Sequence, residues 1–301
     1  MGKKRIAQRK PMTNDEFLAK LQGHSASFAK AVATNEGDWI IKGFIDVYRQ
    51  IYTVSVDTKI VSKVLELLLF PMFVDFATQN SLELKLCPQQ NYYPDLSFIE
   101  KESGAKFAVD IKSTYRIDEN RVNGMTLGAF TGYFRKRESS KNTLYPYGQY
   151  SGHFVLGVIY SQTEAAMDER KSYTLNDLAK IPSVIKNFRF FVQPKYRIAT
   201  ARPGSGNTKN IGSVIKIADL VSGNGPFAQL GEQVYDDYWI YYLTKDMALA
   251  LGVPRPYMNL KTYSEYKQRG IDILKAHKQE IETLTEEDDA GSEPEQHEGG
   301  E

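Results

Sequence analysis

The sequence predicts an α/β or α+β protein, in which helices lie on either side of a strand-rich middle. Alternating or β-branched segments typical of strands occupy residues 82–86, 95–100, 106–114, 152–160, 188–200 and 213–217. Helical spacing of apolar residues occurs near both ends of the chain, which argues against a bundle of helices. No long Pro/Gly/Ser linker divides the middle of the 301 residues, so we expect one elaborated domain.

Two helices are expected in the first 80 residues. The first spans 14–33, with its apolar residues on one side, although Gly23 weakens the pattern. A strand at 51–56 leads into Asp57, a good N-cap for a second helix whose apolar residues recur from Ile60 to Leu68. We expect this helix to continue, kinked at Pro71, to about residue 78.

The strands of the middle region are separated by turns and loops. The segment 82–86 alternates strictly, and a polar loop of Pro88 to Asn91 follows it. A turn at Ser103-Gly104 should fold 95–100 and 106–114 into a hairpin. The strands 188–200 and 213–217 are joined by a loop at 202–210, and helical patterns resume after Tyr235.

The formal charge of +1 hides an asymmetry along the chain. Residues 285–301 contain eight acids and no Lys or Arg, so residues 1–284 hold 38 basic and 29 acidic side chains, a net charge of +9. Such a surplus is typical of a body that binds a polyanion. We expect a basic flexible arm at 1–12, the folded domain at 13–284 and a disordered acidic tail at 285–301, which could simply aid solubility.

The sequence favours a soluble protein of a reducing compartment. Cys87 is the single cysteine, so a disulfide within the chain is excluded and a cytoplasmic location fits. The basic start is not followed by an apolar stretch, as a secretory signal would require. The longest apolar run, at 65–74, contains Glu66 and Pro71 and is too short to span a bilayer.

The hairpin carries the strongest chemical signal. In the strand 106–114 the apolar residues at 107, 109 and 111 share one face, while Asp110 and Lys112 share the other. Asp95 opens the preceding strand, so pairing of the two strands could set it beside Asp110. Two neighbouring carboxylates repel each other unless a divalent cation neutralises them.

Magnesium suits such a pair, because it is commonly held by one or two carboxylates together with water and phosphate oxygens. The ion can polarise a phosphodiester, and Lys112 could stabilise developing negative charge or help to orient and deprotonate the attacking water. The reaction indicated is phosphodiester hydrolysis. The pattern is short, and a hairpin face exposed to solvent would produce it as well.

Further polar positions bear on this interpretation. Glu66 lies among leucines on a helix, where an acid needs a partner or a metal unless it turns to solvent. Glycines in the loop Gly204–Asn210 allow close approach to a ligand, Asn207 could pair with adenine, and the methyl group of Thr208 could pack on thymine. A plain flexible hairpin is the alternative for this loop. The polar loop before Asp95 could likewise be an ordinary turn.

Several segments, taken together and in order, resemble the EcoRV family of type II restriction endonucleases and, more broadly, the PD-(D/E)xK nucleases. The resemblance runs from about Ile51 to Trp239. The matching segments are Asp57-Thr58-Lys59, Glu66-Leu67, Gln89-Gln90-Asn91-Tyr92-Tyr93-Pro94-Asp95, Val109-Asp110-Ile111-Lys112-Ser113-Thr114-Tyr115, Thr126-Leu127-Gly128, Tyr145-Pro146, Gly204-Ser205-Gly206-Asn207-Thr208, Asn210-Ile211-Gly212-Ser213 and Asp237-Tyr238-Trp239.

The resemblance implies a restriction-endonuclease-like fold, with a central mixed β-sheet flanked by helices. It implies a bacterial homodimer that clasps double-stranded DNA and, with Mg²⁺, cuts both strands of a palindrome to leave blunt ends. Two-fold symmetry of the protein matches a palindromic site. Because the Gly-Ser-Gly-Asn-Thr loop is retained, we expect the site GATATC, with its central TA step read through its deformability. A cognate DNA methyltransferase is implied in the host.

Residue roles are carried over by position. Asp95 and Asp110 would be the metal ligands, Lys112 the catalytic lysine and Glu66 an accessory acid and metal ligand. The residues expected to contact DNA are Gln89, Gln90, Asn91, Ser113, Thr114, Lys141, Gly204, Ser205, Gly206, Asn207, Thr208 and Lys209. Lys209 replaces a neutral residue of the family loop. Lys141 is matched to a lysine of the family that contacts the DNA backbone, and the loop that precedes it is longer in this sequence.

Two other functions remain open on the sequence. A repair or structure-specific nuclease of the same superfamily would share the catalytic residues without needing the base-reading loop. A sequence-specific DNA-binding protein with an inactive site is the other alternative, and the presence of all three charged residues argues against it. Cleavage of long duplex DNA with Mg²⁺, followed by sequencing of the ends, would separate the three.

Overall fold

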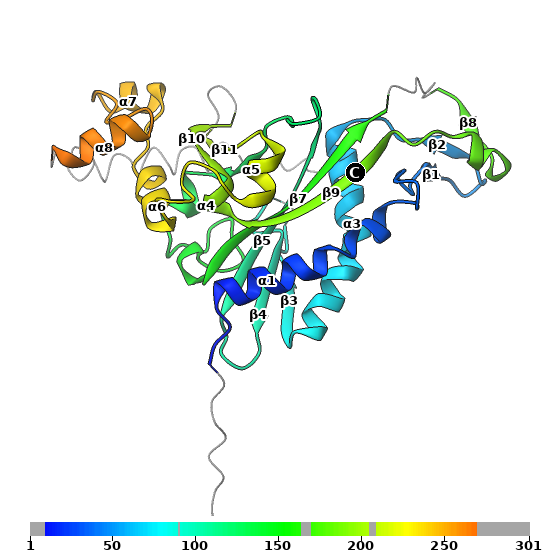
Figure 1. Cartoon of the computed structure of the whole chain (residues 1–301), viewed down its shortest axis with the longest axis horizontal. Coiled ribbons are helices and arrows are strands. Elements are labelled where there is room, and N and C mark those ends of the chain that lie inside the picture. Colours follow the sequence, from blue (N-terminus) through cyan, green and yellow to red (C-terminus); the bar gives the residue numbers. More distant parts are fainter. Residues whose placement is uncertain (1–9, 90, 164–169, 205–208, 270–301) are drawn as a thin grey trace, which may run out of the picture.

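A mixed five-stranded sheet lies at the centre of the computed structural model, which describes residues 10–89, 91–163, 170–204 and 209–269 (Figure 1). Its strands, in spatial order, are β3 (Leu82–Leu86), β4 (Leu96–Glu100), β5 (Lys106–Tyr115), β7 (Gly152–Gln162) and β9 (Ile185–Pro194). Neighbouring strands are antiparallel except for β5 and β7, which run parallel. The prediction of a mixed sheet within an α+β fold is therefore confirmed.

Helices from the first third of the chain cover one face of this sheet. They are α1 (Asn14–Ser25), α2 (Phe28–Val32) and α3 (Thr58–Gln79). Phe107, Val109 and Ile111 of β5 point into the core on this side, as the alternation of the sequence predicts. Phe17 of α1 stacks on Phe107, with ring centroids 4.3 Å apart, so the helix is fixed directly onto the strand that carries Asp110.

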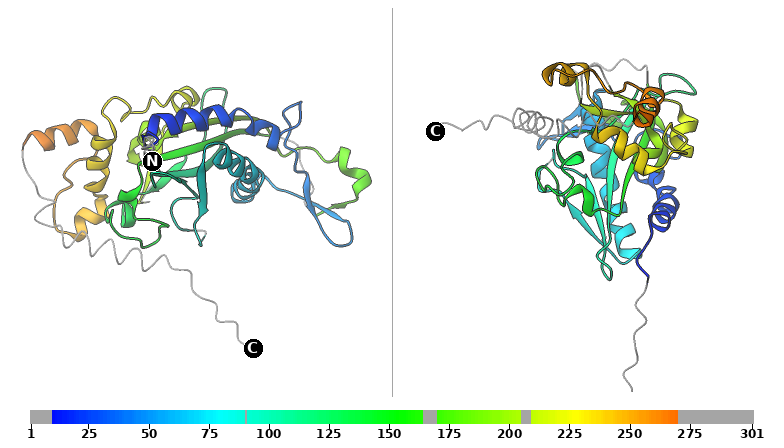
Figure 2. Two further views of the ribbon diagram at one scale, coloured as in Figure 1. Left: turned by 90° about the horizontal axis from the view of Figure 1, so that it is seen from below. Right: turned by 90° about the vertical axis from the view of Figure 1, so that its left-hand side faces the viewer.

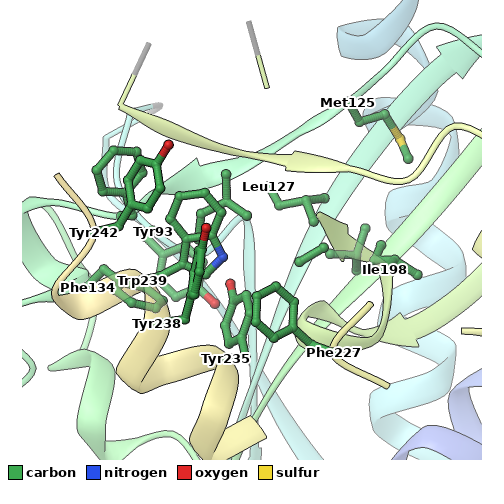
Figure 3. Packing of buried hydrophobic residues seen from close by; sticks show 14 of the residues in the cluster. Tyr93, Met125, Leu127, Phe134, Ile198, Phe227, Tyr235, Tyr238, Trp239 and Tyr242 are labelled. Carbon is green, nitrogen blue, oxygen red and sulfur yellow. The ribbon is translucent and has the colours of Figure 1, made fainter. Parts of the chain in front are cut away.

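The opposite face carries a second core that is rich in aromatic side chains. The elements there are β6 (Thr126–Ala129), α4 (Lys195–Ile198), β10 (Ala199–Pro203), β11 (Asn210–Ser213), α5 (Ile217–Ser222) and α6 (Glu232–Ile240). The three strands form an antiparallel sheet in the order β10-β11-β6. Tyr235, Tyr238 and Trp239 of α6 pack in this core beside Phe227 and Tyr93 (Figure 3). Figure 2 gives two further views of this arrangement.

Smaller elements lie at the two ends of the molecule (Figure 1). At one end a three-stranded sheet in the order β1-β2-β8 projects from the body, and at the other end lie two helices. The bounds are β1 (Gly43–Ile45), β2 (Ile51–Thr53), β8 (Ser172–Tyr173), α7 (Lys245–Ala250) and α8 (Leu260–Gln268). Short 3₁₀ turns complete the described elements, at η1 (Gly132–Phe134), η2 (Tyr147–Gln149) and η3 (Leu175–Lys180).

Helix α3 forms as the sequence predicts. The carboxylate of Asp57 accepts hydrogen bonds from the backbone amides of Lys59 and Ile60, at 2.9 and 3.1 Å, and so satisfies two free donors of the first turn. Pro71 lies inside the helix, which continues to Gln79. Among the helices that the structure describes, none combines the length and the apolar character that crossing a membrane requires.

Several predicted elements differ in the structure. The strand expected at 51–56 is β2, which ends at Thr53. The helix expected at 14–33 is two helices, which meet at residues 26–27. The strand expected at 188–200 ends at Pro194, because proline has no amide hydrogen with which to continue the ladder, and α4 and β10 follow. The strand expected at 213–217 is shifted to 210–213, since Ile217 already begins α5.

The predicted termini fall mostly outside the described residues. Residues 1–9 of the basic arm and the whole acidic tail at 285–301 are not described. At the end of the arm, the Met12 amide donates a hydrogen bond of 2.9 Å to the carboxylate of Glu100 in β4.

Two leucines on α3 test the packing of this helix. Leu69 is fully buried, whereas Leu67 is 64% exposed. Leu69→Ala should lower the free energy of unfolding by about 2–5 kcal/mol, because it removes buried apolar surface and leaves a cavity. Leu67→Ala should lower it by less than about 1 kcal/mol. Urea denaturation of both variants measures the difference, and equal losses would contradict the assigned face of α3.

Candidate active site

The hairpin of β4 and β5 brings the two predicted carboxylates together. In its register Leu96 lies opposite Val109, so Asp95 reaches the middle of β5. The backbone amide of Ile111 donates a hydrogen bond of 2.7 Å to Oδ2 of Asp95. The amide of Asp95 in turn lies 3.4 Å from Oδ1 of Asp110. Backbone pairing therefore fixes the position of both side chains.

Lys112 lies against this pair, as the alternation of β5 predicts. Its Nζ is 3.5 Å from Oδ2 of Asp110 and 3.8 Å from Oδ2 of Asp95. Asp110 is buried, while Lys112 and Asp95 each keep about a quarter to a third of the side chain exposed (26% and 31%). The three groups thus form a compact charged site that solvent reaches from the side of Asp95 and Lys112.

The environment shifts the proton affinities of two of these groups. Burial raises the pKa of Asp95 to about 6, and although Lys112 lowers it, the charges of Asp110 and Glu66 add to the rise. For Lys112, burial lowers the pKa, but the adjacent Asp110 and Asp95 outweigh that effect and raise it above its ordinary value. Lys112 is therefore a cation at neutral pH.

A second lysine, Lys195, reaches the same site and was missed by the sequence analysis. Its Nζ lies 3.9 Å from Oδ2 of Asp110 and 4.2 Å from the centroid of the Tyr93 ring. Burial lowers its pKa to about 8, an effect that the charge of Asp110 partly offsets. The sequence feature that could have pointed to Lys195 is Pro194, because a strand tends to end at a proline and the following residue then leaves the sheet.

Glu66 lies near the pair but is engaged elsewhere. Its carboxylate forms an ion pair of 2.9 Å with Lys63 on the same helix. It lines a cavity of about 640 Å³ together with Asp95. Within the described ranges no three His, Cys, Asp or Glu side chains converge as a metal cluster. The role of Glu66 as a metal ligand stays a prediction.

The polar loop before Asp95 lines the same cavity. Gln89 and Asn91 are exposed at its wall, whereas Gln90 lies outside the described residues. Cys87 also lines it, and its Sγ donates a hydrogen bond of 3.3 Å to the carbonyl oxygen of Tyr93. Burial raises the pKa of the Cys87 thiol to about 11. The loop expected to contact DNA is thus next to Asp95.

A second cleft, of about 500 Å³, opens on Lys112. Ser113 and Thr114 line it, but their hydroxyl groups already have partners within the protein. The Ser113 hydroxyl is 2.7 Å from that of Ser62 on α3. The Thr114 hydroxyl donates to the carbonyl oxygen of Asn123 at 2.5 Å. A contact of Thr114 with phosphate would require this bond to be shared or broken.

The expected base-reading loop begins and ends at fixed points beside this cleft. The amide of Gly204 donates to the carbonyl oxygen of Asn210 at 2.9 Å, and the amide of Phe130 donates to that of Lys209 at 2.9 Å. A Cβ at Gly204 would meet the methyl group of Thr126, which lines the cleft of Lys112. Between these ends, Ser205, Gly206, Asn207 and Thr208 lie outside the described residues.

Lys141 is exposed, in a loop that is joined to the active site through the backbone. The amide of Tyr93 donates to the carbonyl oxygen of Asn142 at 2.9 Å, and the amide of Leu144 donates to that of Tyr93 at 3.0 Å. Tyr93 stands two residues before Asp95, so the loop of Lys141 borders the carboxylate pair.

The donor set fits a hard divalent cation. Asp95 and Asp110 supply carboxylate oxygens, the ligand type that hard divalent cations prefer, and burial raises the pKa of Asp95. Asp95 lines a solvent-accessible cavity, from which water and a phosphate oxygen could complete a coordination shell. Two adjacent carboxylates beside a lysine suit metal-assisted phosphodiester hydrolysis.

Comparison with known proteins agrees with this chemistry. The family model of restriction endonuclease EcoRV matches residues 35–268. The type II restriction enzyme EcoRV of Escherichia coli is 36% identical over 202 residues, which cover 66% of this chain and 81% of that enzyme. Among solved structures, NlaIV restriction endonuclease covers 85% of this chain and 96% of its own, at 9% identity and a TM-score of 0.38. The extent of the family match and the identity to that relative show that the chain belongs to the EcoRV family of type II restriction endonucleases, which are site-specific deoxyribonucleases.

Proposed function

We propose that the protein uses Mg²⁺ to hydrolyse one phosphodiester bond in each strand of the palindrome GATATC, leaving blunt ends. The observation that carries the proposal is the meeting of Asp95 and Asp110 with Lys112, whose Nζ is within 4 Å of both carboxylates. Asp95 lines one cleft and Lys112 lines another. The retained Gly-Ser-Gly-Asn-Thr sequence at 204–208 supports the choice of site.

Each group has a distinct part in this reaction. Asp95 and Asp110 would hold the Mg²⁺, which supplies positive charge to polarise the scissile phosphodiester and to stabilise the leaving oxygen. Lys112 keeps its proton, since the adjacent carboxylates raise its pKa, and so donates hydrogen bonds to the phosphate. It therefore stabilises the negative charge that develops as water adds to phosphorus. Of the two roles that the sequence leaves open for Lys112, its charge favours this one.

The arrangement of the clefts supports a path for the DNA strand. Gln89 and Asn91 border Asp95 on one side, and Ser113 and the base of the loop at Gly204 border Lys112 on the other. A strand lying along these clefts would pass the carboxylate pair. Asn207 and Thr208 would read adenine and thymine in the major groove.

Cutting both strands of a palindrome calls for two sites related by symmetry, and we propose a homodimer. The hairpin of β1 and β2 offers a surface that the second copy could contact. It exposes Val47 and Tyr48, at 89% and 82%, together with Phe44 and Ile45. Apolar surface of this kind, projecting from the body, is typical of a protein interface (Figure 1).

A restriction enzyme of this type would act on DNA in the bacterial cytoplasm. Its host would need a methyltransferase that modifies the same GATATC sites. Without that modification the enzyme would cut the host chromosome.

The first test of the proposal is cleavage of a duplex that holds a single GATATC. With Mg²⁺ we expect two blunt-ended fragments, and no cleavage when one outer base pair is changed. Asp110→Ala should lower the cleavage rate by at least about 100-fold, because one of two ligand carboxylates is lost. The control Asp246→Ala changes an exposed acid on α7 and should leave the rate unaltered. Random nicking, or cutting only at branched DNA, would refute the proposed site.

The cleavage rate should depend on pH through Asp95. Its pKa of about 6 means that below this pH a proton occupies the carboxylate and excludes the cation, whereas above it the carboxylate is charged. At limiting Mg²⁺ the single-turnover rate should therefore rise with pH through about 6. Because Mg²⁺ competes with that proton, a tenfold higher Mg²⁺ concentration should move the midpoint to lower pH. A midpoint that stays in place would exclude Asp95 as a ligand.

The proposed dimer surface is tested by placing charge on it. Size-exclusion chromatography with light scattering should give twice the chain mass of 34.2 kDa for the unaltered protein. Tyr48→Asp combined with Val47→Asp should give the monomer mass, because two carboxylates would be buried without partners. Leu249→Asp is the matched control, since Leu249 is 77% exposed on α7. Dissociation by the control alone would assign the interface to the other end of the molecule.

A further inference from the structure

Lys195 occupies an unusual position for a lysine. It is the first residue of α4, directly after β9, and it is only 2% exposed. A lysine is rarely buried to this extent without a partner, because removing its charge from water is costly. Its Nζ lies over the ring of Tyr93, 4.2 Å from the centroid, and 5.7 Å from that of Tyr147. The aromatic faces and Asp110 together accommodate the charge.

Asp110 consequently lies between two lysines, one partly exposed and the other buried. Lys112 is 3.5 Å from Oδ2 of Asp110 and partly exposed, while Lys195 is 3.9 Å from the same oxygen on the buried side. Two further acids act on Lys195 more weakly, and each has another partner: Asp95 lies 3.8 Å from Lys112, and Asp236 of α6 forms an ion pair of 2.8 Å with Arg137. Asp110 is therefore the acid with which the buried lysine is directly paired.

We propose that Lys195 is a positioning residue for cleavage, which holds the Asp110 carboxylate from the buried side and limits the attraction of the carboxylate pair for a divalent cation. The inference rests on the proposed function, because it concerns the same two carboxylates. Lys195 acts through Asp110, and the buried side on which it lies separates it from a substrate in the clefts.

The charges at the site give the reason. Asp95 and Asp110 carry two negative charges, and Lys112 and Lys195 carry two positive charges, while Glu66 is balanced by Lys63. Without Lys195 the four-residue site would have a net charge of −1 and would attract a divalent cation more strongly. Lys112 would then be the remaining partner of both carboxylates and would be drawn toward them. It would be less available to the phosphate.

The experiment measures cation binding directly, with Mn²⁺ as the probe. The full-length protein is titrated with Mn²⁺ at pH 7, and the free ion is counted by electron paramagnetic resonance. Lys195→Met keeps an unbranched side chain of nearly the same length but removes its charge, and should bind Mn²⁺ about 5–10-fold more tightly. Lys195→Arg keeps the charge and should restore the unaltered affinity. Lys20→Met, an exposed lysine of α1, is the control and should change nothing.

Single-turnover cleavage of the GATATC duplex gives the second readout. Lys195→Met should cut at least about 10-fold more slowly despite its tighter binding of the cation, because Asp110 and Lys112 are no longer held in place. A residue with only a structural role would weaken cation binding and cleavage together. An unchanged or weaker Mn²⁺ affinity in Lys195→Met, or an unchanged cleavage rate, would overturn the proposal.

Two precautions keep the test decisive. If circular dichroism shows that Lys195→Met does not fold, Lys195→Gln replaces it, since the amide can still donate to Asp110 without a charge and should give the same gain in Mn²⁺ affinity. If the unaltered protein cuts no duplex DNA, the proposed function fails. The Mn²⁺ titration then decides the role of Lys195 independently.

Discussion

One hydrogen bond sets the geometry on which the active site depends. The amide of Ile111 donates to the Asp95 carboxylate at 2.7 Å, and this bond exists because β4 pairs with β5 in a register that places Leu96 opposite Val109. A slip of one residue would turn Asp110 into the apolar core around Phe17 and move Phe107 to the face that carries Asp110 and Lys112. The stacking of Phe17 on Phe107 resists that slip, since the aromatic core beneath the sheet accepts only one register. The chemistry of the site is thus held by packing on the face that carries no charge.

Charge balance is the second constraint, and it links the two faces of the molecule. Bringing two carboxylates together is costly, and the protein compensates with lysines from two separate elements, one on β5 and one at the start of α4. The second lysine is held by Tyr93, which stands just before Asp95 and also pairs with the loop of Lys141. The segment 93–95 therefore joins the aromatic core, the carboxylate pair and a surface expected to meet DNA.

The sequence was informative where the cause of a structure is local. The cap at Asp57, the alternation along β5 and the turn after β4 depend on neighbouring residues, and each is found as predicted. Lys195 could not be foreseen, because its role depends on where β9 ends and on which distant strand its side chain then reaches. The two-residue strand β8 is similar, since it exists only through pairing with β2 from the start of the chain. Glu66 was singled out for its leucine neighbours, yet its partner in the structure is Lys63 on its own helix.

The half-buried thiol of Cys87 has a practical consequence for the enzyme in oxidising conditions. With a pKa of about 11, roughly one molecule in ten thousand carries the thiolate at pH 7. Peroxides and alkylating reagents attack the thiolate, so the one cysteine of the chain is chemically quiet although it lines the cavity of Asp95. Labelling of this thiol should therefore need a high pH, and a fluorophore attached there would report from beside the carboxylates at a single position of the chain.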